Sequence, residues 1–170
     1  MYVGLDDQQT KKARAKAMRL LEHMDRTEKG LEEKLRQADF SEEAVADALR
    51  YVKSFGYLND EHYAEVYIRG RIRSKSRQQI FQELMKKGID RELIRDAWEA
   101  VSELEEPDER DMIRSEILKK YSPGDELNEK EMRRLQGYFA RRGFRFEDVS
   151  AVLARLDIQM AEYRKNRERD

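Results

Sequence analysis

Residues 56–89, GYLNDEHYAEVYIRGRIRSKSRQQIFQELMKKGI, decide the fold because they carry the start and stop signals of two successive helices. Asn59 is placed to cap the first helix, and the carboxylates that follow it suit the positive end of a helix dipole. Ser76 and Gln79 have the spacing of a capping box at the start of the second helix, and Gly88 is placed to end it. The stretch therefore predicts two helices joined by a short connection.

Each of these helices has one apolar face, because its hydrophobic residues recur at the spacing of a helical turn. They are Ala64, Tyr67, Ile68 and Ile72 in the first helix, and Ile80, Leu84 and Met85 in the second. We expect both faces to be buried.

Cations gather in the same stretch, although the whole chain has a net charge of −1. Residues 69–88 hold seven basic side chains and one acidic side chain, which gives +6 (7 − 1). The basic residues are Arg69, Arg71, Arg73, Lys75, Arg77, Lys86 and Lys87. Arg69, Arg73 and Arg77 are four residues apart and would form one ridge on a continuous helix. Such a run is either a solvated helix face or a binding surface.

The composition favours small helical modules with large hydrated surfaces, because 42% of the 170 residues are charged and 39% are hydrophobic. The absence of cysteine excludes disulfides and thiolate metal sites. No apolar run reaches transmembrane length and no signal-peptide core begins the chain, so we expect a cytoplasmic protein without membrane contact. His23 and His62 are the only histidines, and no glycine-rich phosphate loop occurs. These features predict no metal, no cofactor and no enzymatic activity.

Five apolar positions recur three times along the chain, at offsets of 49 residues (31 to 80) and 55 residues (80 to 135). The three sets are Leu31, Leu35, Phe40, Val45 and Leu49; Ile80, Leu84, Ile89, Ile94 and Trp98; and Leu135, Phe139, Phe144, Val149 and Leu153. With the preceding helix added to each copy, the repeat predicts an all-α fold of three tandem three-helix modules. The modules span residues 1–56, 57–104 and 105–160, and a charged tail follows at 161–170.

Local signals in the last third of the chain mark its helix boundaries. Pro107 suits the first position of a helix, and residues 122–125, Ser-Pro-Gly-Asp, predict a turn. Asn128 and Glu131 have capping-box spacing, so the next helix is expected to begin there.

The sequence resembles the RecX family, bacterial regulators of the RecA recombinase. The family pattern is G-Y-[IL]-[ND]-D-x-x-[FY]-A, followed by I-x-x-E-L-x-x-K-G-I. The matching residues, which we interpret as mainly structural, include Gly56, Tyr57, Asp60, Tyr63, Ala64, Tyr67, Ile80, Leu84, Gly88 and Ile89. The chain departs from the pattern in three places. Ser76 replaces a usual glycine but caps a helix well, whereas Gly30 and Arg145 weaken local helices and not function.

The resemblance implies a non-enzymatic modulator, mostly an inhibitor, with its three modules in an elongated, curved arrangement. Members of the family bind along the groove of RecA filaments on single-stranded DNA and tune ATPase activity and strand exchange. We therefore expect a monomer whose partners are the RecA filament and, weakly and without sequence preference, single-stranded DNA. The candidate contacts are the basic residues of 69–88 and a second set, Arg133, Arg134, Arg141, Arg142 and Arg145.

Two other functions remain open from the residues alone. A helix-turn-helix reader of duplex DNA would contact bases with the start of the second helix of each pair. Seven of the eight residues at those positions are carboxylates, which disfavours base readout; the eight are Glu42, Glu43, Asp47, Arg91, Glu92, Asp96, Glu147 and Asp148. A generic helical scaffold for protein partners fits the composition equally well.

Overall fold

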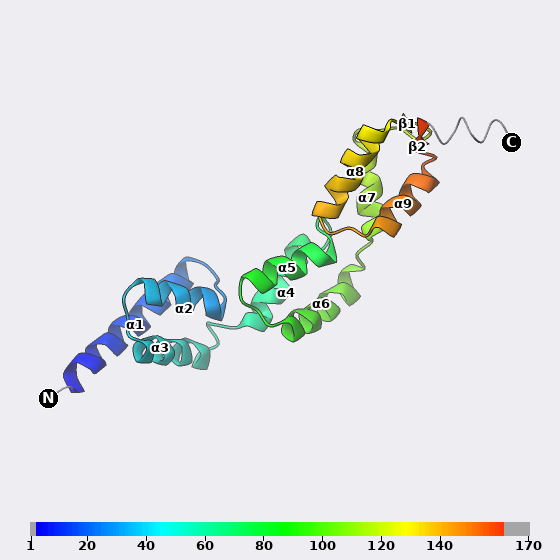
Figure 1. The fold of residues 1–170 in the computed structure, drawn as a ribbon. Coiled ribbons are helices and arrows are strands. Elements are labelled where there is room, and N and C mark those ends of the chain that lie inside the picture. Colours follow the sequence, from blue (N-terminus) through cyan, green and yellow to red (C-terminus); the bar gives the residue numbers. More distant parts are fainter. Residues whose placement is uncertain (1–2, 162–170) are drawn as a thin grey trace. The chain divides into compact units, whose positions relative to one another are not determined.

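The computed structural model describes residues 3–161, and the regular structure of this part of the chain is almost entirely helical (Figure 1). Its elements are α1 (Val3–His23), α2 (Glu28–Gln37), α3 (Glu42–Ser54), α4 (Asp60–Arg71), α5 (Arg77–Lys86), α6 (Arg91–Glu105), α7 (Glu109–Leu118), β1 (Glu126–Leu127), α8 (Glu129–Arg141), α9 (Phe146–Arg155) and β2 (Gln159–Met160). The all-α prediction is confirmed. Residues 162–170 of the predicted charged tail lie outside the described residues.

The chain forms two compact units. One comprises the chain up to Gly70 together with Phe81–Leu104, and the other comprises Arg71–Ile80 together with the chain from Glu105 onward. The three module boundaries given above stay a prediction.

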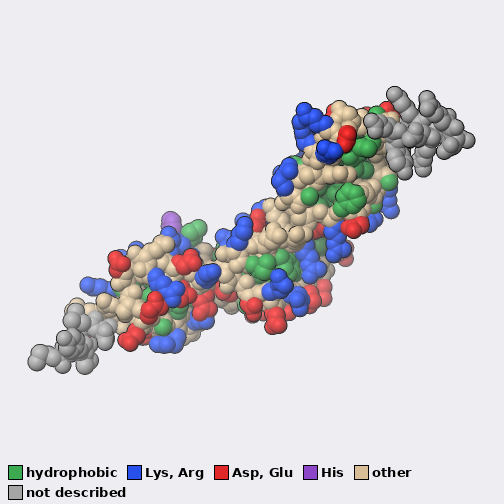
Figure 2. All heavy atoms as spheres, in the orientation of Figure 1, with side chains coloured by type: hydrophobic (Ala, Val, Ile, Leu, Met, Phe, Trp, Pro, Cys, Tyr) green, Lys and Arg blue, Asp and Glu red, His purple; other side chains and the backbone are tan. Residues whose placement is uncertain are grey.

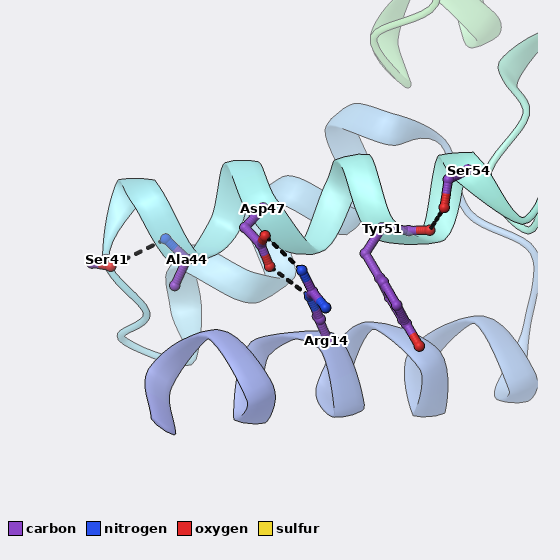
Figure 3. Close-up of polar contacts among 6 residues, drawn as sticks. All are labelled: Arg14, Ser41, Ala44, Asp47, Tyr51 and Ser54. Carbon is purple, nitrogen blue, oxygen red and sulfur yellow. Dashed lines mark hydrogen bonds and ion pairs between the residues drawn. The ribbon is translucent and has the colours of Figure 1, made fainter. Parts of the chain in front are cut away.

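In the first unit, α1 and α3 pack closely because small residues line the contact. Ala13 and Ala17 of α1 and Ala48 of α3 are almost completely buried, so the two backbones can approach each other. Figure 3 shows how Arg14 joins the two helices at the edge of this contact. Its guanidinium donates two hydrogen bonds to the Asp47 carboxylate, at 2.7 and 2.9 Å, and its Cζ lies 4.5 Å from the centre of the Tyr51 ring. This hydrogen-bonded pair lowers the pKa of the Asp47 carboxyl.

The second unit has its own core between α7, α8 and α9, with Ile113, Ile117 and Phe139 at most 1% exposed. The predicted turn at 122–125 is confirmed: Asp125 N–H donates to the Ser122 carbonyl at 3.1 Å, and Gly124 has a φ of 88°. The parallel pairing of β1 with β2 was not predicted, because each strand has only two residues and shows no periodicity.

Helix caps follow the local signals in most places. Asn59 accepts the His62 N–H at 3.0 Å, and Asn128 forms the full capping box with Glu131. Arg145 caps α9 without a side-chain hydrogen bond, as its identity predicts. The placement of Pro107 as a first helical residue is wrong, because Asp108 is the N-cap of α7 and the helix begins at Glu109.

The structure contains the predicted repeat. The helices α3, α6 and α9 begin at residues 42, 91 and 146, which are 49 and 55 residues apart, as the apolar sets require. All fifteen repeat positions are buried except Phe40 and Leu135, which are partly buried. Met85 is 37% exposed, so the prediction that it is buried is wrong. The neighbouring Leu84 occupies the narrow apolar stripe of α5 instead.

The turns before α3, α6 and α9 also share one conformation. Asp39, Gly88 and Gly143 occupy equivalent positions with φ values of 62°, 86° and 81°. Glycine is required at the last two positions for a second reason as well. A Cβ at Gly88 would lie 2.2 Å from Cδ of Lys29, and one at Gly143 would lie 2.8 Å from Oγ of Ser76. The starts of α2 and α5 are therefore seated against these two turns.

In the first unit, the N-cap hydroxyl of α2 connects the start of this helix to the turn at Gly88, and we call this contact a junction. The Thr27 hydroxyl accepts the Gly30 N–H at 3.0 Å and donates to the Lys87 carbonyl at 2.8 Å. Beside it, the Glu28 N–H donates to Oδ1 of Asp60 at 2.8 Å. Three polar groups at the start of α2 are thus satisfied within a contact where Thr27 is only 4% exposed.

The second unit repeats this junction at the start of α5. The Ser76 hydroxyl accepts the Gln79 N–H at 3.2 Å and donates to the Arg142 carbonyl at 2.5 Å. The Arg77 N–H donates to Oε1 of Glu109 at 2.6 Å. Ser76 and Arg77 follow Thr27 and Glu28 by 49 residues, and Glu109 follows Asp60 by the same number (76 − 27, 77 − 28 and 109 − 60). The Ser76 side of the predicted capping box is confirmed, and its hydroxyl has this additional role.

We expect Thr27→Val to lower the free energy of unfolding by about 1–3 kcal/mol, because it leaves a part-buried N–H and a part-buried carbonyl without their partner while it preserves shape. Thr27→Ser is the matched control, since serine performs the same role at position 76. Urea unfolding followed by circular dichroism measures both variants. Equal stability of the valine variant and the wild type would contradict a structural role for this hydroxyl.

The repeat predicts a second contrast, between neighbouring positions of α5. Leu84→Ala should cost about 2–5 kcal/mol of unfolding free energy, because Leu84 is fully buried. Met85→Ala, at the exposed neighbouring position, should cost much less. A loss below about 1 kcal/mol for Leu84→Ala in the same unfolding measurement would mean that this column of the repeat is not core.

Candidate interaction surface

The residues of the 56–89 pattern divide into buried and exposed groups. Ala64, Ile80, Leu84 and Ile89 are at most 3% exposed and belong to the core. Gly88 supplies the positive φ of the turn described above. These five positions have clear structural reasons for their identity.

Tyr57 does not lie in the core, because it is 55% exposed. Its ring stacks on that of Phe55 with the centroids 5.7 Å apart, and Phe55 is equally exposed. Tyr57 also borders a hollow of about 460 Å³ between α1 and the start of α4, which Met18 and Tyr63 help to line. This exposed aromatic pair is a surface feature that the structural interpretation of the pattern did not anticipate.

Tyr63 and Tyr67 lie one turn apart on α4 with their rings stacked, at a centroid distance of 6.2 Å. The Tyr67 hydroxyl donates to Oε2 of Glu83 at 2.6 Å, and Nζ of Lys87 lies 5.7 Å from the Tyr67 ring centre. Tyr67 therefore links α4 to the end of α5 within the first unit. The cation of Lys87 lies near its aromatic face.

Asp60 has a position in the first junction rather than on an open surface. Its carboxylate accepts the Glu28 N–H at 2.8 Å. Burial raises the pKa of the Asp60 carboxyl, and the hydrogen bond from Glu28 opposes this effect in part.

The first basic set does not form one helical ridge. The prediction that Arg69, Arg73 and Arg77 form a ridge is wrong, because α4 ends at Arg71 and α5 begins at Arg77. Arg73 lies in the connection, where its guanidinium pairs with Glu105 at 2.9 Å. Its side chain remains 78% exposed, so the pair is weak and the cation is accessible. Arg69 and Lys86 are exposed on α4 and α5, while Arg71 and Lys75 are partly buried.

The second basic set lies entirely in the second unit, on or just after α8. Arg133 pairs with Glu129 one turn earlier, and Arg142 places its guanidinium 4.2 Å from the centre of the Tyr138 ring. Arg134, Arg141 and Arg145 are also exposed. Figure 2 shows Lys and Arg side chains close to hydrophobic side chains over α8 and its neighbours. The structure thus places five of the predicted cations on the surface around one helix.

The sequence analysis missed two further cations in this unit. Lys119 and Lys120 follow the end of α7 and, with Arg134, border a hollow of about 290 Å³ beside α8. The available signal was the pair of adjacent lysines that, with one tyrosine between, precedes the Ser-Pro-Gly-Asp turn. Because that pair lies outside both predicted basic sets, its proximity to α8 becomes visible only in the fold.

The carboxylates at the starts of α3 and α9 have local explanations. Glu42 pairs with Arg36 at 2.9 Å, and Asp148 pairs with Arg110 at 2.8 Å. Acidic residues in a first helical turn also interact favourably with the helix dipole. These ion pairs give no support to base readout by the same positions.

The described residues also bear on other kinds of site. Within residues 3–161, no cluster of three or more histidine or carboxylate side chains is arranged to bind a metal ion. Among the helices of that same part of the chain, none has the length and apolar character needed to span a membrane.

The fold and these surfaces define a class: an all-α protein with a repeated helical pattern and cation-bearing helices. Comparison with known proteins agrees. Residues 13–51 match the first three-helix domain of RecX, and residues 59–97 match the second. A regulatory protein RecX from Caldanaerobacter subterraneus is 34% identical over 146 residues, which cover 85% of this chain and 71% of that protein. A regulatory protein RecX from Clostridium perfringens is 30% identical over 151 residues, covering 85% and 68%.

The chain therefore belongs to the RecX family of regulatory proteins. The crystal structure of RecX from Lactobacillus salivarius has the same fold, with a TM-score of 0.69 and 22% identity over 89% of this chain and 98% of that one. A second RecX crystal structure has a TM-score of 0.67 at 24% identity.

The environment of Asp60 predicts that the free energy of unfolding depends on pH, and Asp60→Asn should remove this dependence because asparagine does not titrate. Asparagine also keeps an oxygen that can accept the Glu28 N–H. Because the pKa of Asp60 is raised in the folded state, the wild type loses stability as the pH rises from the ordinary carboxyl pKa through the raised value. The variant should therefore become more stable relative to the wild type across that interval. Urea unfolding of both proteins between about pH 3.5 and pH 7 measures the difference. A difference that does not change with pH would contradict the prediction.

Proposed function

We propose that this protein modulates the RecA recombinase, mostly as an inhibitor, by binding along RecA filaments on single-stranded DNA. Bound protein would lower DNA-dependent ATPase activity and tune strand exchange. Membership of the RecX family is the observation that carries the proposal. The exposed cations support it, because a chain of net charge −1 gathers them at residues 69–88 and around α8.

The cations would contact the phosphate backbone of the DNA or acidic surfaces of the recombinase. Exposed Arg and Lys side chains on helices bind phosphates without reading bases, so DNA affinity would be weak and independent of sequence. The acidic segment 99–109 does not compete fully with these contacts. Two of its carboxylates have internal partners, since Glu105 pairs with Arg73 and Glu109 accepts the Arg77 N–H.

The proposed binding unit is a monomer of three modules, residues 1–56, 57–104 and 105–160. Short helical modules present a long surface relative to their mass, which suits contact with successive subunits of a filament. No catalytic step is proposed, because inhibition requires only that bound protein oppose the filament's own conformational or catalytic cycle.

The function is tested by titrating the purified protein into RecA assembled on single-stranded DNA and measuring ATP hydrolysis. We expect hydrolysis to fall as the protein is added. Arg69→Glu combined with Arg73→Glu should weaken this inhibition, because the double variant reverses two exposed cations and keeps the core intact. Unchanged helicity by circular dichroism establishes that the double variant is folded.

A matched control makes the same change in net charge at exposed positions outside both basic sets. Lys12→Glu combined with Lys34→Glu changes the net charge equally, at exposed positions of α1 and α2 outside both basic sets. This control should inhibit like the wild type. Equal inhibition by all three proteins would remove Arg69 and Arg73 from the contact surface, and no effect of the wild type on hydrolysis would reject the proposed function.

A further inference from the structure

We propose that the hollow between the end of α7 and α8 is a nucleotide subsite, in which one unstacked base of single-stranded DNA lies against tyrosines and the neighbouring phosphates meet cations. The inference rests on the proposed function, because it assumes that this protein meets single-stranded DNA. It assigns that contact to Arg134 of the second basic set together with Lys120 and two tyrosines that the sequence analysis did not single out.

The inner wall of the hollow is apolar and partly aromatic. Tyr121 lines it from the connection after α7, while Leu135, Tyr138 and Phe139 line it from α8. Its volume of about 290 Å³ lies at the lower limit for sites that bury drug-sized molecules, which suits one base. Aromatic walls suit any base, because every base has a π face on which a ring can stack.

The orientation of Tyr138 is fixed by three contacts. Its ring meets that of Phe139 edge-on with the centroids 5.2 Å apart, and the Arg142 guanidinium lies 4.2 Å from its centre. Its hydroxyl donates to Oε2 of Glu116 at 3.1 Å. A ring held in this way loses little conformational freedom when a ligand binds, so less of the binding energy is lost to ordering.

The rim of the hollow has a positive balance. Lys119, Lys120 and Arg134 lie around it against one carboxylate, Glu116, which gives +2 (3 − 1). Nζ of Lys119 lies 2.5 Å from Oε1 of Glu116, so this carboxylate is already neutralised within the protein. The same hydrogen bond lowers the pKa of Glu116, which keeps the group ionised as an acceptor for the Tyr138 hydroxyl. Nζ of Lys120 lies 5.6 Å from the centre of the Tyr121 ring, so this cation is held beside the proposed base. Lys120 and Arg134 are the cations proposed to meet phosphates.

This combination favours a single strand over the alternatives. A duplex presents phosphates but keeps its bases stacked, so it would leave the aromatic wall empty. An acidic peptide would satisfy the rim but supplies flat rings only at particular residues. An apolar hollow bordered by cations and tyrosines is the usual composition of sites that bind single strands without sequence preference.

The test measures binding of the full-length protein to a fluorescent oligothymidine by anisotropy, at several salt concentrations. Lys120→Gln combined with Arg134→Gln should weaken binding several-fold and reduce the slope of log K against log salt by about 1.4, or about 0.7 for each lost contact. Tyr121→Ala should weaken binding by about tenfold through lost stacking, while Tyr121→Phe should bind like the wild type.

The matched control is Arg114→Gln combined with Arg155→Gln, which removes two exposed cations of the same unit that do not border this hollow. Circular dichroism melting establishes folding for every variant. An equal loss in the control and in the Lys120–Arg134 variant would overturn the subsite, as would equal wild-type affinity for duplex and single strand. Loss of polyglutamate binding with unchanged oligothymidine binding would also overturn it, in favour of an acidic peptide.

The same variants in the recombinase ATPase assay separate this inference from the proposed function. If the wild type inhibits hydrolysis and the hollow variants bind oligothymidine normally, only the subsite is rejected. If the wild type binds oligothymidine through the hollow but leaves hydrolysis unchanged, the subsite stands and the proposed function is rejected.

Discussion

A buried hydroxyl at the start of a helix is the constraint on which both junctions depend. The first N–H groups of any helix have no partner within it, and water cannot reach them where the helix end is packed against another segment. Thr27 and Ser76 solve this problem with one atom each, which accepts from the helix and donates to the carbonyl of a distant turn. The facing turn must then be glycine, because a Cβ at Gly88 or Gly143 would collide with the docked helix end. The hydroxyl and the glycine therefore act together as one motif, and this motif occurs twice in the chain.

The sequence predicted what local signals specify and missed what distant residues create. Caps such as Asn59 and Asn128 act within one helical turn, so spacing alone reveals them. The junction of Thr27 with Lys87 joins residues 60 positions apart, and no local pattern encodes it. Ser76 illustrates the difference. As a departure from the family pattern it was interpreted only as a good cap, yet its completely buried hydroxyl also binds the Arg142 carbonyl.

The candidate surface was predictable in composition but not in geometry. Charge is visible in any sequence, so the gathering of cations at residues 69–88 needed no structure. Their arrangement depended on where α4 ends, and extending one helical period past Arg71 produced a ridge that does not exist. Accessibility depended on partners elsewhere in the chain, as the pairing of Arg73 with Glu105 shows. Lys119 and Lys120 reach the hollow beside α8 only because α7 and α8 are neighbours in the fold.

Stability and the proposed binding use different parts of the helices in this protein. The junctions are built from helix ends, through N-cap hydroxyls, first-turn N–H groups and a carboxylate such as Asp60 or Glu109. The apolar repeat occupies one side of each helix, as the burial of Ile80 and Leu84 shows. The remaining sides are left to cations whose charge the fold does not require, because exposed pairs contribute little to stability. The charges proposed for partner binding can therefore change in this chain while its junction residues keep the units folded.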